Sequence, residues 1–244
     1  MKTLDKIPLV PSKLFGEGIS HYFVWKTDKR GNRIKEHRLI QLTWRDKLGK
    51  IYSLPELKLL NEFHYDTGTG EGWGVTFIPH RNEFYVSDGS ATLVVWDAET
   101  LREKRRVTVT FEREPGRSEE VRYVNELEFV DFATTDDGDA AAGEGARCEE
   151  TGTCAADDAS PFSPTMRILA NIWYQDVLVS ICPQSGKITR VYDLRDIFPL
   201  EEREKEGSDC LNGISVSGTQ DGGGLEVWVT GKLWPKMYRI RLIE

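Results

Sequence analysis

Four short motifs recur along the chain at nearly equal intervals, and this internal repeat constrains the fold more than any other feature. Each motif opens a predicted β-strand with a small, polar or glycine-flanked stretch. The four motifs are FGEGIS (15–20), GWGVTF (72–77), NELEF (125–129) and LNGISV (211–216). Their marker residues are separated by 56, 52 and 87 residues: Glu17, Trp73, Asn125 and Asn212. The last interval falls to about 55 once an insertion of about 32 residues is subtracted. A fixed period of this size predicts several copies of one small β-sheet.

The insertion in the third repeat carries the whole net charge of the chain. Residues 131–160 contain nine acidic residues and one arginine, so their charge of -8 equals that of all 244 residues. The stretch is poor in apolar residues, so burial cannot offset the entropy cost of ordering it. We therefore expect an acidic, disordered loop insertion over residues 132–164. A second charged stretch, KTDKRGNRIKEHR at 26–38, is predicted to be a loop insertion in the first repeat.

Each motif is followed by a second predicted strand that ends in another polar or aromatic marker. These four markers are Trp44, Asp88, Trp173 and Lys232. In consecutive antiparallel strands, the start of the first strand lies beside the end of the second. We therefore expect all the markers to gather at one end of the sheets. A radial array of four-stranded sheets, the β-propeller, would place them in a ring around a central channel, where sites are commonly built.

The composition is that of one globular all-β domain over residues 1–244. The only helical pattern is a short one around 196–206, and no run approaches the roughly 18 apolar residues that span a bilayer. The basic stripe that nucleic-acid binding requires is missing. The histidines and cysteines show no zinc-ligand spacing, so we expect no zinc site. We also expect no cofactor. Cys148 and Cys154 are close enough in sequence to form a disulfide, but spacing alone leaves that pairing open.

The motifs also resemble those of a known family. FGEG, GWG, SDGS, NELEF, ANIW, LNGI and TGKLWPKMYRI, in this order, are similar to the signature series of plant-type glutamine cyclotransferases, which are glutaminyl-peptide cyclotransferases. The resemblance covers residues 15–242 apart from the two insertions. It implies a five-bladed β-propeller, with about four blades present in this chain. The family has a further segment before FGEG, where only about 14 residues stand here, so we expect the first blade to be missing.

The resemblance further implies a metal-independent enzyme that acts on peptides or proteins with an N-terminal glutamine. We expect a monomer, and a secretory location is suggested by the family, although the N-terminus as given lacks the apolar stretch of a signal peptide. Glu17 would be the acid/base carboxylate, with Asn125 and Lys232 as further catalytic groups. The residues expected to contact substrate or wall the pocket are Phe15, Trp44, Trp73, Trp173 and Asp88.

These residue types suit the cyclisation chemistry. The α-amine of glutamine attacks its own δ-carbonyl, so the catalyst must hold a folded substrate and stabilise a tetrahedral oxyanion. A carboxylate partly desolvated among aromatic rings has a raised pKa and can take a proton and return it. Lys232 can supply positive charge to the oxyanion. Each residue also has a structural interpretation: Glu17 or Asp88 as turn residues, the tryptophans as blade packing, and Asn125 as a bridge between blades.

Two other classes of protein fit the same sequence pattern. A metal-dependent, lactonase-type propeller hydrolase would gather carboxylates and amides at one channel mouth, and it would coordinate calcium or zinc through several oxygens. A non-catalytic propeller that serves as a binding scaffold would not need the carboxylate. Inhibition by a chelator separates the first alternative from a cyclotransferase, and replacement of Glu17 separates the second.

Overall fold

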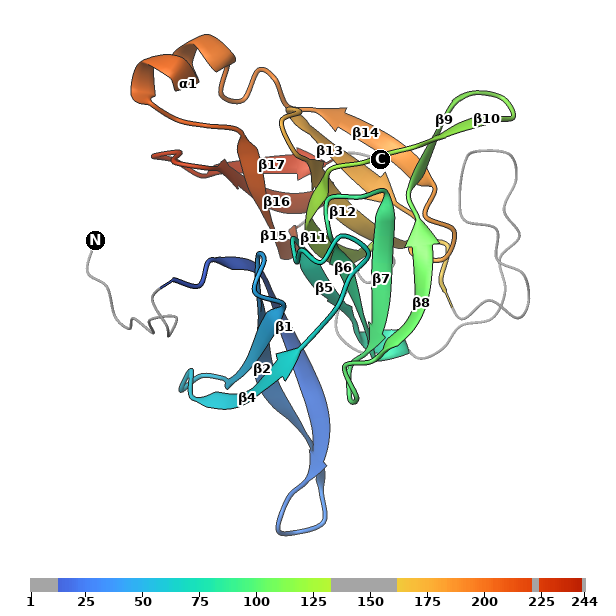
Figure 1. The fold of residues 1–244 in the computed structure, drawn as a ribbon, viewed down its shortest axis with the longest axis vertical. Helices are drawn as coiled ribbons and strands as arrows, with labels where there is room; N and C mark the ends of the chain where they lie inside the picture. Colours follow the sequence, from blue (N-terminus) through green and yellow to red (C-terminus); the bar gives the residue numbers. More distant parts are fainter. Residues whose placement is uncertain (1–12, 133–161, 221–223, 243–244) are drawn as a thin grey trace.

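The structure is a computed structural model, and it describes residues 13–132, 162–220 and 224–242. Most of these residues form four antiparallel sheets of three or four strands, each a meander in chain order, arranged radially (Figure 1). The first strand of each sheet is innermost: β1 contacts β5, β5 contacts β11, and β11 contacts β15. The prediction of an all-β chain with about four propeller blades is confirmed.

The strands follow the sequence repeat. The first sheet contains β1 (Gly16–Thr27), β2 (Arg33–Thr43), β3 (Leu48–Ser53) and β4 (Leu59–His64). The second contains β5 (Val75–Ile78), β6 (Glu83–Ser87), β7 (Thr92–Asp97) and β8 (Glu103–Thr108). The third contains β11 (Val124–Asp131), β12 (Met166–Ile172), β13 (Val177–Ile181) and β14 (Ile188–Asp193). The fourth contains β15 (Leu211–Gln220), β16 (Gly224–Gly231) and β17 (Tyr238–Leu242).

Smaller elements connect the sheets. A two-stranded ribbon of β9 (Thr110–Glu114) and β10 (Arg117–Glu120) joins the second sheet to the third, and a 3-10 turn (Pro79–Arg81) joins β5 to β6. Helix α1 (Leu200–Glu206) precedes the fourth sheet, which confirms the helical pattern expected there. Among the residues that the structure describes, no helix is long and apolar enough to cross a membrane.

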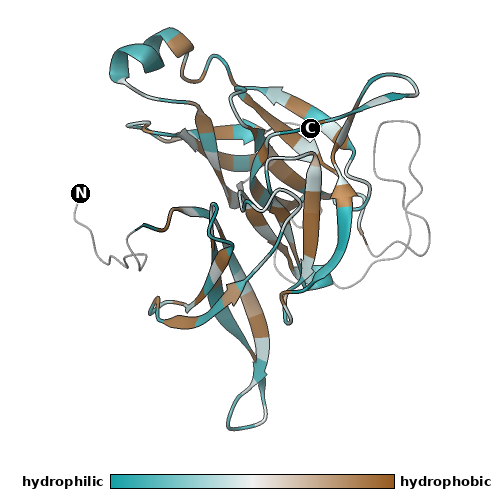
Figure 2. Cartoon of the chain, viewed as in Figure 1, coloured by the Kyte–Doolittle hydropathy of each residue, from teal (hydrophilic) through white to brown (hydrophobic). Residues whose placement is uncertain are grey.

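The core consists of layers of apolar side chains between neighbouring sheets. The strands in the middle of each sheet therefore have buried side chains on both faces. In β7, Val94 packs toward the first sheet, while Leu93 and Val95 face the third. Likewise, Ile168 of β12 packs toward the second sheet and Leu169 toward the fourth. Each such side chain contributes about 1.5–3 kcal/mol when fully buried. Figure 2 shows the resulting hydrophobic bands along the central strands.

Residues 26–38 differ from the predicted loop. Strands β1 and β2 continue through most of this segment as a hairpin that projects from the first sheet, and its tip is hydrophilic (Figures 1 and 2). Cross-strand pairs stabilise it: Lys26 lies 2.5 Å from Glu36, and the Arg33 guanidinium lies 4.2 Å from the centre of the Trp25 ring. The prediction of a loop was wrong for most of this segment, because such cross-strand pairs allow a charged sequence to remain in strands.

The acidic insertion predicted over 132–164 falls mainly on residues 133–161, outside the described part of the chain. Cys148 and Cys154 lie there too. Of the described cysteines, Cys182 is disulfide-bonded, whereas Cys210 is a buried free thiol.

Candidate active site

The strand register brings the sequence markers to one end of the propeller, as predicted. Gly16 pairs with Thr43, so Glu17 lies near Trp44. Val124 pairs with Ile172 in the third sheet, and Leu211 pairs with Gly231 in the fourth. In the second sheet, the backbone N–H of Trp73 donates to the carbonyl of Ser87, next to Asp88. The start of each inner strand therefore lies beside the end of its neighbour.

Two motif glycines allow the inner strands to approach one another at this end. A Cβ atom on Gly18 would lie 2.2 Å from the carbonyl oxygen of Trp73. A Cβ atom on Gly74 would lie 2.8 Å from the backbone nitrogen of Glu126. Both distances are shorter than any normal carbon contact, so only glycine fits. The glycines of FGEG and GWG thus place β1, β5 and β11 in backbone contact around the site.

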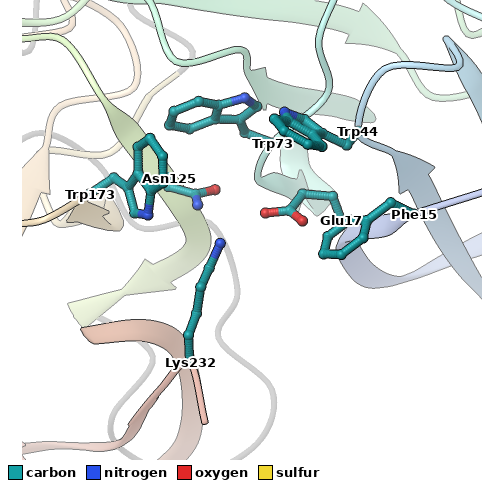
Figure 3. A pocket seen from close by; sticks show the side chains of 7 residues that line it. All are labelled: Phe15, Glu17, Trp44, Trp73, Asn125, Trp173 and Lys232. Carbon is teal, nitrogen blue, oxygen red and sulfur yellow. The ribbon is translucent and has the colours of Figure 1, made fainter. Parts of the chain in front are cut away.

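A small pocket of about 100 Å³ opens among the strand ends (Figure 3). The structure brings together seven of the eight site residues predicted from the sequence, and these residues line the pocket: Phe15, Glu17, Trp44, Trp73, Asn125, Trp173 and Lys232. Figure 3 shows the Lys232 amino group directed toward the space between the Glu17 carboxylate and the Asn125 amide. The Trp44 and Trp73 indoles lie on the opposite side of this space, and the Trp173 indole lies beside Asn125. The first, second, third and fourth sheets all contribute.

Burial raises the pKa of Glu17 above the ordinary carboxyl value. The positive charge of Lys232 and the Asn125 amide both act in the opposite direction, but they only partly offset the effect of burial. The Lys232 ammonium also lies 5.5 Å from the centre of the Trp173 ring, in cation–π range. The pocket therefore contains a carboxyl group with a raised pKa, close to the Lys232 amino group.

Asn125 is buried and links two blades. Its side-chain N–H donates to Oδ1 of Asn212 at 3.0 Å, and its own Oδ1 accepts from the backbone N–H of Glu126 at 2.9 Å. These bonds fix the orientation of the amide. Asn125 thus combines the bridging role and the pocket-lining position that the sequence left as alternatives.

Aromatic rings form the wall of the pocket. Trp73 and Trp173 meet edge to face with centroids 5.2 Å apart, and Phe15 meets Trp44 in the same manner at 6.0 Å. Such pairs are favourable beyond the area that they bury. The rings lie around Glu17, which is half-buried.

Asp88 lies at the same end of its sheet but does not line the pocket. One of its carboxylate oxygens accepts from the backbone N–H and hydroxyl of Ser90, and the other accepts from the backbone N–H of Thr69. Both carboxylate oxygens thus accept hydrogen bonds from loop residues. Asp88 holds the 67–70 segment in place and does not reach the pocket. The repeat predicts the end of the sheet at which a residue lies, but not the direction of its side chain.

Two carboxylates near the pocket were not identified from the sequence. Glu126 lies with Glu17 and Lys232 along an adjoining cavity, and burial together with the negative charge of Glu17 raises its pKa to about 7. Glu71 accepts hydrogen bonds from the indoles of Trp44 and Trp73. Glu126 is adjacent to a marker in NELEF, so its position was a usable signal. Glu71 precedes the GWG motif in a loop, where the repeat gives no indication of its partners.

Comparisons with known proteins agree with this geometry. The family model described as glutamine cyclotransferase matches residues 2–135 and 164–242, which leaves out most of the acidic insertion. A glutaminyl-peptide cyclotransferase of Arabidopsis thaliana is 28% identical over 206 residues, which cover 84% of this chain and 50% of that protein. The chain thus spans about half the length of this curated relative.

A solved structure shares the fold. The crystal structure of Myxococcus xanthus glutaminyl cyclase superimposes with a TM-score of 0.57 at 23% sequence identity, covering 93% of this chain and 72% of that one. At this identity the likeness shows the fold alone. Because the family model matches most of the residues on both sides of the insertion, the chain belongs to the glutamine cyclotransferase family.

Proposed function

We propose that the protein is a glutaminyl-peptide cyclotransferase, which converts the N-terminal glutamine of peptides and proteins to pyroglutamate, releases ammonia and needs no metal. The observation that carries this proposal is the Glu17 carboxyl, which has a raised pKa in a small aromatic pocket beside Lys232 and Asn125. The names of the relatives, a glutaminyl-peptide cyclotransferase and a glutaminyl cyclase, support the same reaction.

In the first step, the neutral α-amine of the substrate attacks the δ-carbonyl carbon of its own glutamine side chain. A carbon–nitrogen bond forms, the carbonyl oxygen becomes an oxyanion, and the attacking nitrogen becomes positively charged. Glu17, ionised at the start, takes a proton from that nitrogen. Lys232, whose ammonium group faces the same space, offsets the negative charge of the oxyanion.

In the second step, the carbonyl re-forms and the bond to the original amide nitrogen breaks. Glu17 returns its proton to this nitrogen, which leaves as ammonia, so the carboxylate ends in its starting state. The aromatic wall supports this sequence in two ways. It holds the glutaminyl side chain folded back on the amine, and it limits the access of water that would hydrolyse the carbonyl.

The proposal is tested by measuring ammonia release from a peptide that begins with glutamine. Purified protein is assayed with and without EDTA, and a peptide of the same sequence that begins with glutamate serves as the control, because it has no amide to lose. Since the chain spans about half of its curated relative, the assay also includes a longer form that spans the full length of that relative.

Release that persists in EDTA and stops with the glutamate peptide is the expected result. Release abolished by EDTA and restored by a divalent metal would contradict metal independence and favour a metal-dependent site. Two folded forms that both release no ammonia would contradict cyclisation and favour a binding scaffold.

A further inference from the structure

One carboxylate outside the pocket joins two of the indoles that form its wall. Oε2 of Glu71 accepts a hydrogen bond from the Nε1–H of Trp44 at 2.9 Å and another from the Nε1–H of Trp73 at 2.9 Å. Trp44 follows β2 in the first sheet, and Trp73 precedes β5 in the second. A single oxygen atom therefore fixes the relative orientation of two rings from different blades.

The other oxygen of Glu71 has its own partner. Oε1 accepts from the Nε–H of Arg45 at 2.9 Å, and the same guanidinium stacks 3.7 Å from the centre of the Trp44 ring. Three N–H donors thus surround the carboxylate. Burial acts to raise its pKa, but the donors together outweigh this effect and hold the pKa below the ordinary value. Because these donors take up its negative charge, Glu71 remains an anionic anchor behind the wall.

The loop that carries Glu71 is held in place as well. The Thr67 hydroxyl donates to the carbonyl of Glu71 at 2.7 Å. The Thr69 hydroxyl donates to the carbonyl of Asp88 at 2.8 Å, and the Thr69 N–H donates to the Asp88 carboxylate at 3.0 Å. The backbone N–H of Gly72 donates to the carbonyl of Trp44 at 2.8 Å. The backbone that carries Glu71 is therefore held by the fold, and the three N–H donors hold its carboxylate.

We propose that Glu71 is a positioning residue, whose carboxylate locks Trp44 and Trp73 into the wall that holds the glutaminyl side chain folded for attack. This inference rests on the proposed cyclotransferase function. Without the shared acceptor, each indole would gain rotational freedom about its side-chain bonds, and the pocket would be preformed for only part of the time. Substrate binding would weaken, while the chemistry at Glu17 would remain available once the substrate was bound.

Two conservative variants separate position from charge. Glu71→Gln keeps the length of the side chain and an oxygen that can accept from both indoles, but it removes the negative charge. Glu71→Asp keeps the charge, but it withdraws the carboxylate by one methylene group, so it cannot reach both indoles. Glu119→Asp and Glu119→Gln are the matched controls, because Glu119 is an exposed glutamate paired with Arg113 in the β9–β10 ribbon.

The experiment measures KM and kcat for a peptide that begins with glutamine, together with the near-ultraviolet circular dichroism of the tryptophans. We expect Glu71→Asp to raise KM by about tenfold or more, with a smaller change in kcat, and to alter the tryptophan bands. Glu71→Gln is expected to stay within about threefold of the parent in KM and to keep its spectrum. The Glu119 variants are expected to match the parent in both measurements.

The opposite order, with Glu71→Gln impaired and Glu71→Asp unchanged, would show that the ion pair with Arg45 matters and would overturn the proposal. A parental KM and spectrum in Glu71→Asp would also overturn it. If neither form of the parent protein releases ammonia, the proposed function fails, and the spectra of the two Glu71 variants still decide whether Glu71 positions the indoles.

Discussion

Replacement of Gly18 by alanine tests whether backbone contact between blades sets the geometry of the site. Gly18 follows Glu17 in β1, and a Cβ atom here would lie 2.2 Å from the carbonyl oxygen of Trp73 and 3.0 Å from the backbone nitrogen of Val75. These are backbone atoms of β5 and of the segment just before it, so no side chain can rotate away. The new methyl group must push the two inner strands apart.

The size of the effect follows from these distances. Ordinary carbon contacts begin near 3.4 Å, so the strands must separate locally by about 1 Å. Overpacking of this kind costs about 1–3 kcal/mol, and each kcal/mol lowers the melting temperature of a chain of this size by about 2–4 °C. A fall of about 2–12 °C is therefore expected. Because Glu17 and Trp73 sit on the displaced segments, a shift of about 1 Å should reduce kcat/KM by about 100-fold.

The assay combines thermal unfolding with ammonia release from a peptide that begins with glutamine, measured well below the melting temperature. Gly116→Ala is the control: Gly116 has φ of +78° in the β9–β10 turn and no atom within 4 Å of its would-be Cβ. Its replacement costs about 1 kcal/mol through backbone strain but leaves the site intact. A Gly18→Ala protein with parental kcat/KM would refute the reasoning, and so would equal losses of activity in the two variants.

Two further predictions concern charge. Replacing Lys232 with methionine removes the positive charge that lowers the pKa of Glu17, so the acid limb of the pH profile of kcat/KM should move to higher pH. An unchanged acid limb would show that Lys232 does not act on the Glu17 carboxyl group. Replacing Glu83 with glutamine should lower the free energy of unfolding at pH 7 by about 2–4 kcal/mol in urea titrations, because this fully buried carboxylate accepts two 2.9 Å hydrogen bonds from Arg105. The pKa of Glu83 is lower in the folded protein than in the unfolded chain, so this stabilisation is complete above the unfolded pKa and disappears as the pH falls through the folded pKa. A difference in unfolding free energy that does not change with pH would argue against this prediction, and so would an equal loss in the exposed control Glu119→Gln.

The position of the site was predictable because the strand register is local. Once the chain is known to repeat a meander of antiparallel strands, the start of one strand must lie beside the end of the next. Glu17 and Trp44, which are 27 residues apart in the sequence, come together for this reason. The same logic places Asn125 near Trp173.

The direction and partners of a side chain were less predictable, because they depend on contacts between blades. Asp88 lies at the expected end of its strand, yet its carboxylate faces a loop of the preceding connection. Glu71 belongs to no repeat, and its role arises from two indoles that meet only in three dimensions. The charged segment 26–38 lacks the apolar alternation of a half-buried strand, so the sequence indicated a loop where cross-strand pairs form a hairpin.

The central claim is that Glu17 transfers the proton between the α-amine and the leaving nitrogen. The most direct test is ammonia release from a peptide that begins with glutamine by the Glu17→Gln variant, compared with its parent in the shortest form that is active. Glutamine preserves the shape of the side chain but cannot accept the proton, so kcat should fall by about 100-fold or more while KM and the melting temperature change little. Undiminished turnover in Glu17→Gln would contradict the account.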